Sequence, residues 1–230
     1  MDFVGKFKVF WELFIVRDGW VRVVTVGLVN TLLIAVLGLL IGIVIGTLIA
    51  AVKVMPKYKK WVRILDKICT VYVGFFRGTP LVVQLLITYY VMWPMMGIAV
   101  SSLNTAIIVF GLNSGAYVSE IVRGGIQSVD PGQREAAAAM GMTHAQTMIY
   151  VVLPQAIRRV LPVYKGELIS LIKNTSIVGY VAVADLTRAS YIIRGRTFDP
   201  FFPLLMVAIL YFLIAWLFTQ ALDRASRKIR

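Results

Sequence analysis

Three long stretches of the chain carry no charged side chain, and they constrain the fold more than any other feature. They are residues 23–52, 78–119 and 201–222, which cover 30, 42 and 22 positions. Because a bilayer core of about 30 Å needs roughly 20 apolar residues per helix, each stretch can cross a membrane. Only 15% of the residues are charged, against about a quarter in a soluble domain. We therefore expect an all-α polytopic membrane protein with a single transmembrane domain over residues 1–230.

Five transmembrane helices account best for the charges of the loops. We predict spans at about 25–52, 68–92, 105–122, 164–184 and 201–222. The loops after the first and third spans and the C-terminal tail then hold 15 basic residues, whereas the opposite side holds 7. Because loops rich in Lys and Arg stay in the cytoplasm, we expect an external N-terminus and a cytoplasmic C-terminus. A sixth span at 136–157 would cancel most of this bias.

The composition excludes several kinds of site. Cys69 is the only cysteine and His144 the only histidine, so we expect no disulfide framework and no metal site built on these residues. The sequence lacks a G-x-x-x-x-G-K-[ST] phosphate loop, so the chain is not expected to be an ATPase itself. The basic residues that give the net charge of +13 lie mainly in the loops where membrane orientation alone would place them. A scaffold that binds nucleic acid or anionic lipid is therefore the weaker interpretation.

The first span carries a stripe of small residues. Gly38, Gly42 and Gly46 recur at every fourth position. Such a stripe lets another helix approach closely. We expect it to serve packing within the chain rather than dimerisation.

The segment REAAAAMGMTHAQTMIYVVLPQ, residues 134–155, is apolar but makes a poor span. It contains His144, Gln146, two threonines and Pro154. Alanine and methionine favour helix, whereas Gly141 and Pro154 interrupt it. We predict two or more short helices in a cytoplasmic loop at about 125–160, with a bend near Gly141.

This segment resembles the EAA loop of the membrane permease subunits of ABC importers. The pattern is Glu-Ala-Ala, three residues, Gly, nine residues, an aliphatic residue, one residue and Leu-Pro, and here it comprises Glu135, Ala136, Ala137, Gly141, Val151, Leu153 and Pro154. Val151 stands where isoleucine is usual. Four further segments resemble the polar amino acid branch of that family, which serves histidine, glutamine, arginine and glutamate: FRGTPLVVQ (76–84), GAYVSEIVRGGIQSVDPGQREAA (115–137), LPQAIRRVLP (153–162) and LIKNTSIVGY (171–180).

The resemblance implies a type I importer permease whose loop forms a coupling helix on a cytoplasmic ATPase. The residues expected to contact or position that ATPase are Glu135, Ala136, Ala137, Gly141, Met142, Thr143 and His144. The expected partners are two ATP-binding subunits, a second permease chain (identical or paralogous), an external solute-binding protein and a polar amino acid. ATP and Mg²⁺ would bind to the partner ATPase, and this chain would hold no cofactor. The location implied is the bacterial inner membrane.

Polar residues inside the predicted spans indicate a substrate pathway. Arg77 and Lys173 lie at membrane depth, where charges usually face a cavity or a partner. Pro80 predicts a kink, and the polar run at 173–176 predicts local unwinding. The candidate pathway residues are Arg77, Thr79, Gln84, Asn113, Tyr117, Glu120, Lys173, Asn174, Thr175 and Ser176. The alternative is that they pack helices together, with Glu120 paired to Arg77 or Arg123.

A secondary transporter driven by H⁺ or Na⁺ is the main competing function. It would explain charges inside the membrane without an ATPase partner. It would not explain the EAA-like loop, and the sequence shows no pair of similar interrupted helices that would mark an inverted repeat. No catalytic residue is expected in either case, because both functions are transport.

Overall fold

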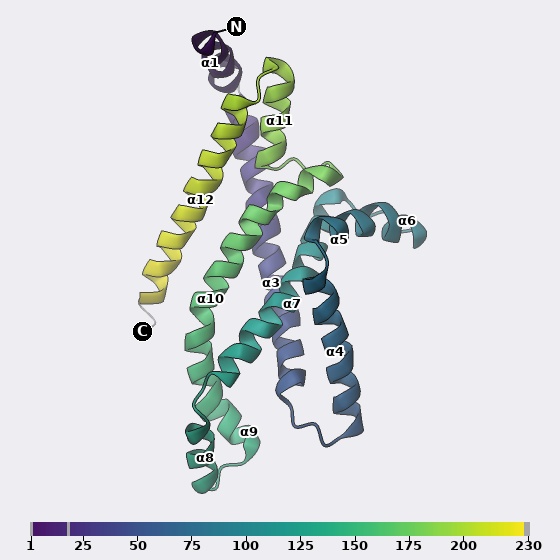
Figure 1. The fold of residues 1–230 in the computed structure, drawn as a ribbon, viewed down its shortest axis with the longest axis vertical. Coiled ribbons are helices and arrows are strands. Elements are labelled where there is room, and N and C mark those ends of the chain that lie inside the picture. Colours follow the sequence, from purple (N-terminus) through teal and green to yellow (C-terminus); the bar gives the residue numbers. More distant parts are fainter. Residues whose placement is uncertain (1, 18, 228–230) are drawn as a thin grey trace.

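The computed structural model describes residues 2–17 and 19–227, except for the side chains at 22, 24 and 225–227. Lys228 and Arg230 of the predicted basic tail lie outside the described residues. The described chain is an elongated arrangement of helices, with the N-terminus at one end and the hairpin of α8 and α9 at the other (Figure 1).

Within the described residues, three helices are long and apolar enough to cross a membrane on their own. The first runs over Gly19–Val54 and comprises α2 (Gly19–Val21), a π-helical segment (Arg22–Leu28) and α3 (Val29–Val54). The others are α7 (Ser102–Gln127) and α12 (Phe201–Arg227). Of the most apolar stretch of α7, 61% is buried, against 28% for the first helix and 22% for α12. α7 is therefore the central helix of the bundle.

Two bent pairs of helices bring the number of candidate spans to five. In the first pair, α4 (Lys60–Gly78) meets α5 (Leu81–Ile87), which continues through a π-helical segment (Thr88–Met92) into α6 (Trp93–Met95). In the second pair, one helix runs over His144–Val181 and then meets α11 (Leu186–Thr197) at an angle of 52°. It comprises α9 (His144–Gln146), a π-helical segment (Thr147–Val152), α10 (Leu153–Asn174) and a 3₁₀ segment (Thr175–Val181).

Several helix boundaries differ from those expected from hydropathy. Pro80 does more than kink the second span, since the two halves meet at 105°. The loop predicted before the fifth span contains α11. The polar run at 173–176 does not unwind: its first two residues end α10 and its last two begin the 3₁₀ segment. That segment is followed by Ala182, which has a left-handed φ of 62°. These differences arise where hydrogen bonds to side chains, rather than apolar periodicity, decide the backbone path.

The prediction of a helix break at Pro154 is wrong. The helix that begins at His144 passes through Pro154 and continues to Val181. Just before the proline, the N–H of Leu153 bonds to the carbonyl of Met148, five residues back, in a π-helical turn. Proline clashes with the carbonyl four residues before it in a regular α-helix. The wider π turn relieves that clash and lets the helix continue.

The glycine stripe of α3 packs against α7. A Cβ added at Gly42 would lie 2.6 Å from Ser114 Oγ, and one at Gly46 would lie 2.8 Å from the carbonyl oxygen of Gly115. Gly38 faces Phe110 in the same way, at 3.1 Å from its Cβ. The expectation that this stripe serves packing within the chain is therefore confirmed.

We expect Gly46→Ala to destabilise the permease fold by about 1–3 kcal/mol, because the added methyl overpacks the contact with the α7 backbone. The matched control is Gly74→Ala in α4, where a Cβ would meet nothing within 4 Å. The control should be neutral or slightly stabilising, because alanine favours helix over glycine. The midpoint of thermal unfolding in detergent measures both. Equal midpoints for the two variants would show that the helices do not approach this closely.

The N-terminal end of the bundle is held by aromatic and polar contacts. α1 (Phe3–Trp11) is followed by a π-helical segment, Glu12–Val16. Phe10 stacks on Phe202 at the start of α12, with ring centroids 5.7 Å apart, and Lys6 Nζ lies 3.1 Å from Asp199 Oδ1. α1 therefore docks on the beginning of α12.

The start of α11 is fixed by the buried Asp185. Its carboxylate accepts hydrogen bonds from two backbone N–H groups in the first turn of α11 and from the hydroxyl of Tyr211 in α12, at 3.2 Å. Asn30 of α3 donates to the carbonyl of Ala184 at 2.8 Å. These bonds tie α3, α11 and α12 together at one end of the bundle.

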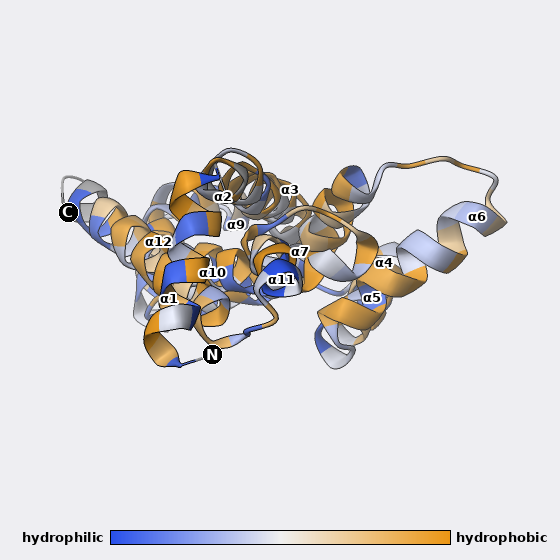
Figure 2. Cartoon of the chain, turned by 90° about the horizontal axis from the view of Figure 1, so that it is seen from above, coloured by the Kyte–Doolittle hydropathy of each residue, from blue (hydrophilic) through white to orange (hydrophobic). Residues whose placement is uncertain are grey.

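Apolar residues cover much of the outside of the molecule as well as its interior (Figure 2). Leu48 of α3 and Phe212 of α12 are 65% and 67% exposed. In water such faces would be costly, whereas lipid chains solvate them.

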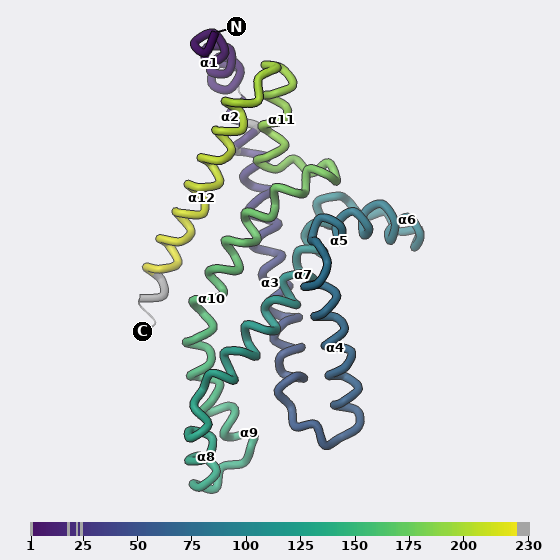
Figure 3. The backbone as a smooth tube through the Cα atoms, viewed as in Figure 1, coloured from purple at the N-terminus to yellow at the C-terminus, as the bar shows by residue number. Residues whose placement is uncertain are grey.

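At the end of the molecule opposite the N-terminus, the chain turns sharply between α8 (Pro131–Ala139) and α9, as the backbone trace shows (Figure 3).

Candidate functional site

The break between α4 and α5 is filled by side-chain amides. Helix α4 ends at Gly78, which leaves the carbonyl of Phe76 without a partner in the helix. Gln84 Nε2 donates to this carbonyl at 2.9 Å, and Asn113 Nδ2 of α7 donates to it at 3.0 Å. Gln84 also bonds Thr79 Oγ1, at 2.8 Å. Irregular backbone at membrane depth must find partners within the protein, and these amides supply them.

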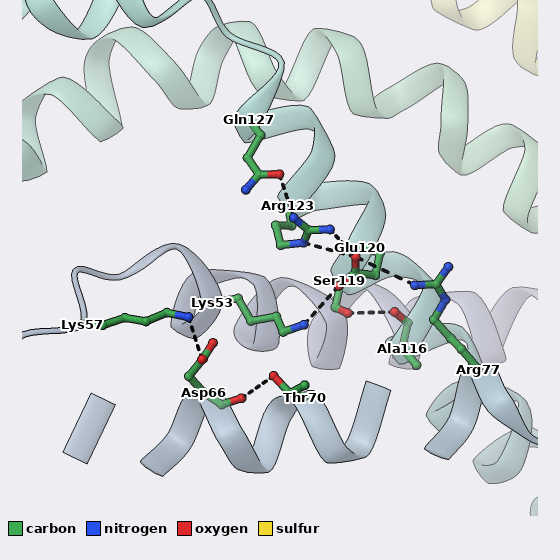
Figure 4. A network of polar contacts seen from close by, with 10 residues as sticks. All are labelled: Lys53, Lys57, Asp66, Thr70, Arg77, Ala116, Ser119, Glu120, Arg123 and Gln127. Carbon is green, nitrogen blue, oxygen red and sulfur yellow. Dashed lines mark hydrogen bonds and ion pairs between the residues drawn. The ribbon is translucent and has the colours of Figure 1, made fainter. Parts of the chain in front are cut away.

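Next to this break, three cations surround one carboxylate. Glu120 of α7 lies 3.2 Å from Lys53 Nζ, 2.5 Å from Arg123 NH2 and 3.8 Å from Arg77 NH1 (Figure 4). Because Lys53 ends α3 and Arg77 ends α4, the carboxylate joins three helices. Cations outnumber the carboxylate, so the cluster favours a further anionic group. We call Lys53, Arg77, Glu120 and Arg123 the Glu120 cluster.

Arg77 is the most accessible member of the Glu120 cluster. Its side chain is 44% exposed, whereas that of Glu120 is 19% exposed. The guanidinium lies 5.4 Å from the ring centroid of Tyr117, a distance at which a cation–π interaction holds it in place. Arg77 is thus positioned but only loosely paired, and its outer N–H groups can reach another anion.

The structure brings together some of the predicted pathway residues and separates others. Asn113, Tyr117 and Glu120 recur at positions i, i+4 and i+7, a spacing that predicts one helix face. All three face the end of α4 together. Lys173, Asn174 and Ser176 are exposed on another helix, and among the described residues no hydrogen bond or salt bridge joins them to the Glu120 cluster. Thr175 is buried, donates to the carbonyl of Ile172 at 2.7 Å and lies 3.4 Å from the hydroxyl of Tyr211 in α12, so it takes part in helix packing.

Sequence reasoning missed two members of the polar interior. Lys53 lies one residue beyond the predicted first span, but its apolar stem runs back to Glu120 and its side chain is 14% exposed. Glu167 of α10 accepts a hydrogen bond from Ser114 Oγ of α7 at 2.9 Å. An acidic residue inside the predicted fourth span was the signal that could have identified Glu167. Within the described residues, no group of three His, Cys, Asp or Glu side chains could hold a metal.

The EAA-like segment folds as a tight helical hairpin. At the end of α8, the N–H of Gly141 bonds the carbonyl of Ala138 at 2.9 Å, and the N–H of Met142 bonds that of Ala137 at 3.1 Å. This pair of bonds is a Schellman motif, which needs a left-handed residue at Gly141, and its φ is 80°. Two residues later, Thr143 begins α9 with a capping box. The predicted bend at Gly141 is therefore a defined turn.

The hairpin projects from the bundle and is joined firmly to two membrane helices. Arg134 NH2 of α8 donates to the carbonyl of Ile126 in α7, at 2.9 Å. Ala137, in the last turn of α8, is buried. The outer surface of the hairpin is exposed and includes Glu135, Ala136, Met140, Gly141, Thr143, His144, Ile149 and Tyr150. Because α9 continues into α10 without a break, a displacement of the hairpin must move a membrane helix.

Residues 38–230 match the model of a protein family described as "Binding-protein-dependent transport system inner membrane component". The chain belongs to this family. It is a transmembrane permease subunit rather than an enzyme. The prediction of an ABC importer permease with an all-α, type I fold is confirmed, and the ATP-driven mechanism is favoured over the ion-gradient alternative. The five predicted spans agree with the candidate spans when each bent pair in the described residues counts as one.

Individual relatives agree with this assignment. The permease is 34% identical to the arginine transport system permease protein ArtQ of Bacillus subtilis (strain 168), over 89% of this chain and 91% of ArtQ. It is 37% identical to the L-cystine transport system permease protein TcyB of the same organism, over 95% of this chain and 91% of TcyB. A chain of a solved structure described as an amino acid ABC transporter with histidines is 34% identical, with a TM-score of 0.84 and 99% of each chain covered.

The amides at the α4–α5 break should matter for the stability of the permease. We expect Gln84→Met to lower the free energy of unfolding by about 1–3 kcal/mol, because Thr79 and the carbonyl of Phe76 lose a buried donor. The control is Gln220→Met in α12, which makes the same substitution at a position away from the α4–α5 break. Combining Gln84→Met with Asn113→Leu should lower the unfolding midpoint further than Gln84→Met alone, since the carbonyl then loses both side-chain donors. An unchanged unfolding midpoint in the double variant would mean that water donates the hydrogen bonds to the carbonyl of Phe76 in place of the two amides.

Proposed function

We propose that this permease forms the membrane pathway of an ATP-driven importer of a polar amino acid. The observation that carries the proposal is the α8–α9 hairpin, an exposed projection that is continuous with a membrane helix over His144–Val181. The two Bacillus subtilis relatives are named as arginine and L-cystine transport permeases, which supports a polar amino acid as the cargo.

The hairpin couples the pathway to a separate ATPase. Two ATP-binding subunits would each receive one hairpin from a pair of permease chains, and ATP with Mg²⁺ would bind on those subunits. The exposed apolar residues Met140 and Ile149 and the small residue Ala136 offer a surface on which a groove can close. Movement of the ATPase subunits on ATP binding would pass along α10 and alternately open each end of the pathway.

The Glu120 cluster is the place where the amino acid meets the pathway. Its α-carboxylate would pair with Arg77, which is half-exposed and loosely held, and its α-ammonium would approach Glu120. A guanidinium binds a carboxylate through two parallel hydrogen bonds, so Arg77 suits this role. The exposed residues Lys173, Asn174 and Ser176 would line the pathway elsewhere, whereas Gln84, Asn113 and Thr79 support the break beside it.

We place the hairpin in the cytoplasm of a bacterium, with the permease in its inner membrane. The α3–α4 connection and the hairpin lie at the same end of the molecule, opposite the N-terminus (Figure 1). The first of these carries the basic residues Lys57 and Lys59, which are retained on the cytoplasmic side. The N-terminal end would then face an external solute-binding protein that delivers the substrate.

Transport by reconstituted vesicles tests the proposal. The permease is reconstituted with its candidate ATPase, and radiolabelled arginine or cystine is supplied together with the binding protein. Uptake should require ATP on the side of the hairpin and should persist when H⁺ and Na⁺ gradients are collapsed. Uptake that continues without ATP but stops when a gradient is collapsed would overturn the proposal in favour of a secondary transporter.

A further inference from the structure

A cavity at the N-terminal end of the bundle has no role in the transport scheme. Its volume is about 590 Å³, within the range of roughly 300–1,000 Å³ that is usual for ligand sites. It lies between the segment after α1, the beginning of the first span and α11. Most of its lining is apolar, and the residues concerned are Leu13, Val21, Val26, Ala189, Ile192 and Ile193.

A second cavity adjoins the first and has a different character. Its volume is about 470 Å³, and it is lined by Val9, Glu12, Leu13, Arg17 and Arg196. Leu13, Arg17 and Arg196 line both cavities, so the two spaces meet at these three side chains. The apolar cavity suits the hydrocarbon part of an amphiphile, and the two guanidinium groups at the junction suit an anionic head group.

The two arginines differ in how they are paired. Arg17 NH2 lies 3.1 Å from Glu12 Oε1, and both side chains are more than half exposed. Arg196 is exposed and forms no salt bridge with any residue that the structure describes. A guanidinium presents its N–H groups in a planar fork that fits a phosphate. Arg196 can therefore bind a phosphate without first losing a carboxylate among the described residues.

Exposed aromatic side chains place this double cavity at the edge of the bilayer. Trp11 and Trp20 are 51% and 43% exposed, and Phe3 and Phe7 of α1 are exposed beside them. Tryptophan gathers where lipid chains meet headgroups, because its ring is amphipathic. The first span begins here, at Gly19. The amphiphile in reach of the cavity is thus a membrane lipid.

We propose that the double cavity binds one anionic phospholipid. Its phosphate lies at the junction beside Arg196 and Arg17, and part of one acyl chain fills the apolar space next to Val26 and Ile192. The inference rests on the membrane location of the chain and not on the proposed transport function. It adds a lipid site at the end of the molecule opposite the coupling hairpin.

Fluorescence quenching by brominated lipid tests this proposal. Trp20 lies between two lining residues, so a variant that keeps Trp20 and has Phe at the other four Trp positions reports on the site. It is reconstituted in phosphatidylcholine vesicles that contain increasing fractions of phosphatidylglycerol brominated on its acyl chains. Half-quenching should occur at a fraction at least threefold lower than brominated phosphatidylcholine requires. Millimolar inorganic phosphate should not reverse it, because the acyl chain contributes to binding.

Two variants and a control make the result specific. Arg196→Gln should raise the half-quenching fraction at least threefold by removing the phosphate partner. Val26→Phe should raise it by filling the apolar space, and Lys59→Gln in the α3–α4 connection should leave it unchanged. Equal quenching by the two lipids, or half-quenching that neither Arg196→Gln nor Val26→Phe alters, would overturn the proposal. Reversal by inorganic phosphate would also overturn it, since the site would then hold the anion alone.

Discussion

Replacing Gly141 with valine should lower the rate of ATP-driven uptake tenfold or more, while the permease remains folded in the membrane. Gly141 has a φ of 80°, and its Schellman bonds end α8. Valine is strongly disfavoured at positive φ because its branched side chain clashes with its own backbone. A Cβ at this position would meet no other residue within 4 Å, so the effect comes from the backbone conformation of residue 141 and not from a clash with its neighbours. We expect the turn to open, so that the hairpin would present an altered surface to the proposed ATPase partner.

Asparagine at the same position is the matched control, because it tolerates the left-handed conformation better than any branched residue. Gly141→Asn should retain most of the uptake. Binding of the purified ATPase in detergent and ATP hydrolysis in vesicles separate the two possible failures. Lost binding would show that the turn anchors the ATPase, and retained hydrolysis without uptake would show that it transmits motion. Normal uptake by Gly141→Val would refute the assignment of the hairpin as the coupling element.

Local sequence patterns predicted the parts of the structure that depend on neighbouring residues. The glycine spacing in α3 predicted its packing stripe, and the turn at Gly141 could be placed because glycine readily adopts the left-handed conformation that ends a helix. The common face of Asn113, Tyr117 and Glu120 followed from helical periodicity alone. Each of these inferences needs information from fewer than ten consecutive residues.

Features that depend on distant residues were not predictable. The 105° break at Pro80 is stabilised by Asn113, 37 positions from Phe76, which donates a hydrogen bond to the free carbonyl of Phe76. Lys53 reaches Glu120 across 67 positions, which no local pattern reveals. The continuous helix through Pro154 depends on a π turn, and hydropathy does not distinguish a π turn from an α turn. Tertiary hydrogen bonds at Phe76 and Glu120, and a hydrogen bond within the helix before Pro154, thus decided what apolar periodicity left open.

Replacing Glu120 with glutamine should have the second large effect, on both stability and uptake. The change leaves Lys53, Arg77 and Arg123 near one another without a carboxylate. Removing one partner from a fully buried ion pair costs roughly 3–5 kcal/mol, and the cost here should be lower because 19% of the Glu120 side chain is exposed. We expect a lower unfolding midpoint and at least a tenfold loss of uptake. Asp66→Asn is the control, since Asp66 pairs with the half-exposed Lys57 alone.

A second substitution separates a packing role of Glu120 from a role in substrate recognition. Adding Lys53→Met to Glu120→Gln removes one of the unpaired cations and should restore most of the lost stability. If Glu120 only holds helices together, uptake should return along with the unfolding midpoint. If Glu120 also meets the α-ammonium of the amino acid, uptake should stay low in the stable double variant, with a raised KM. We expect the latter, because Glu120 and the half-exposed Arg77 lie side by side. Together they offer a zwitterion an anionic partner and a cationic partner at one place.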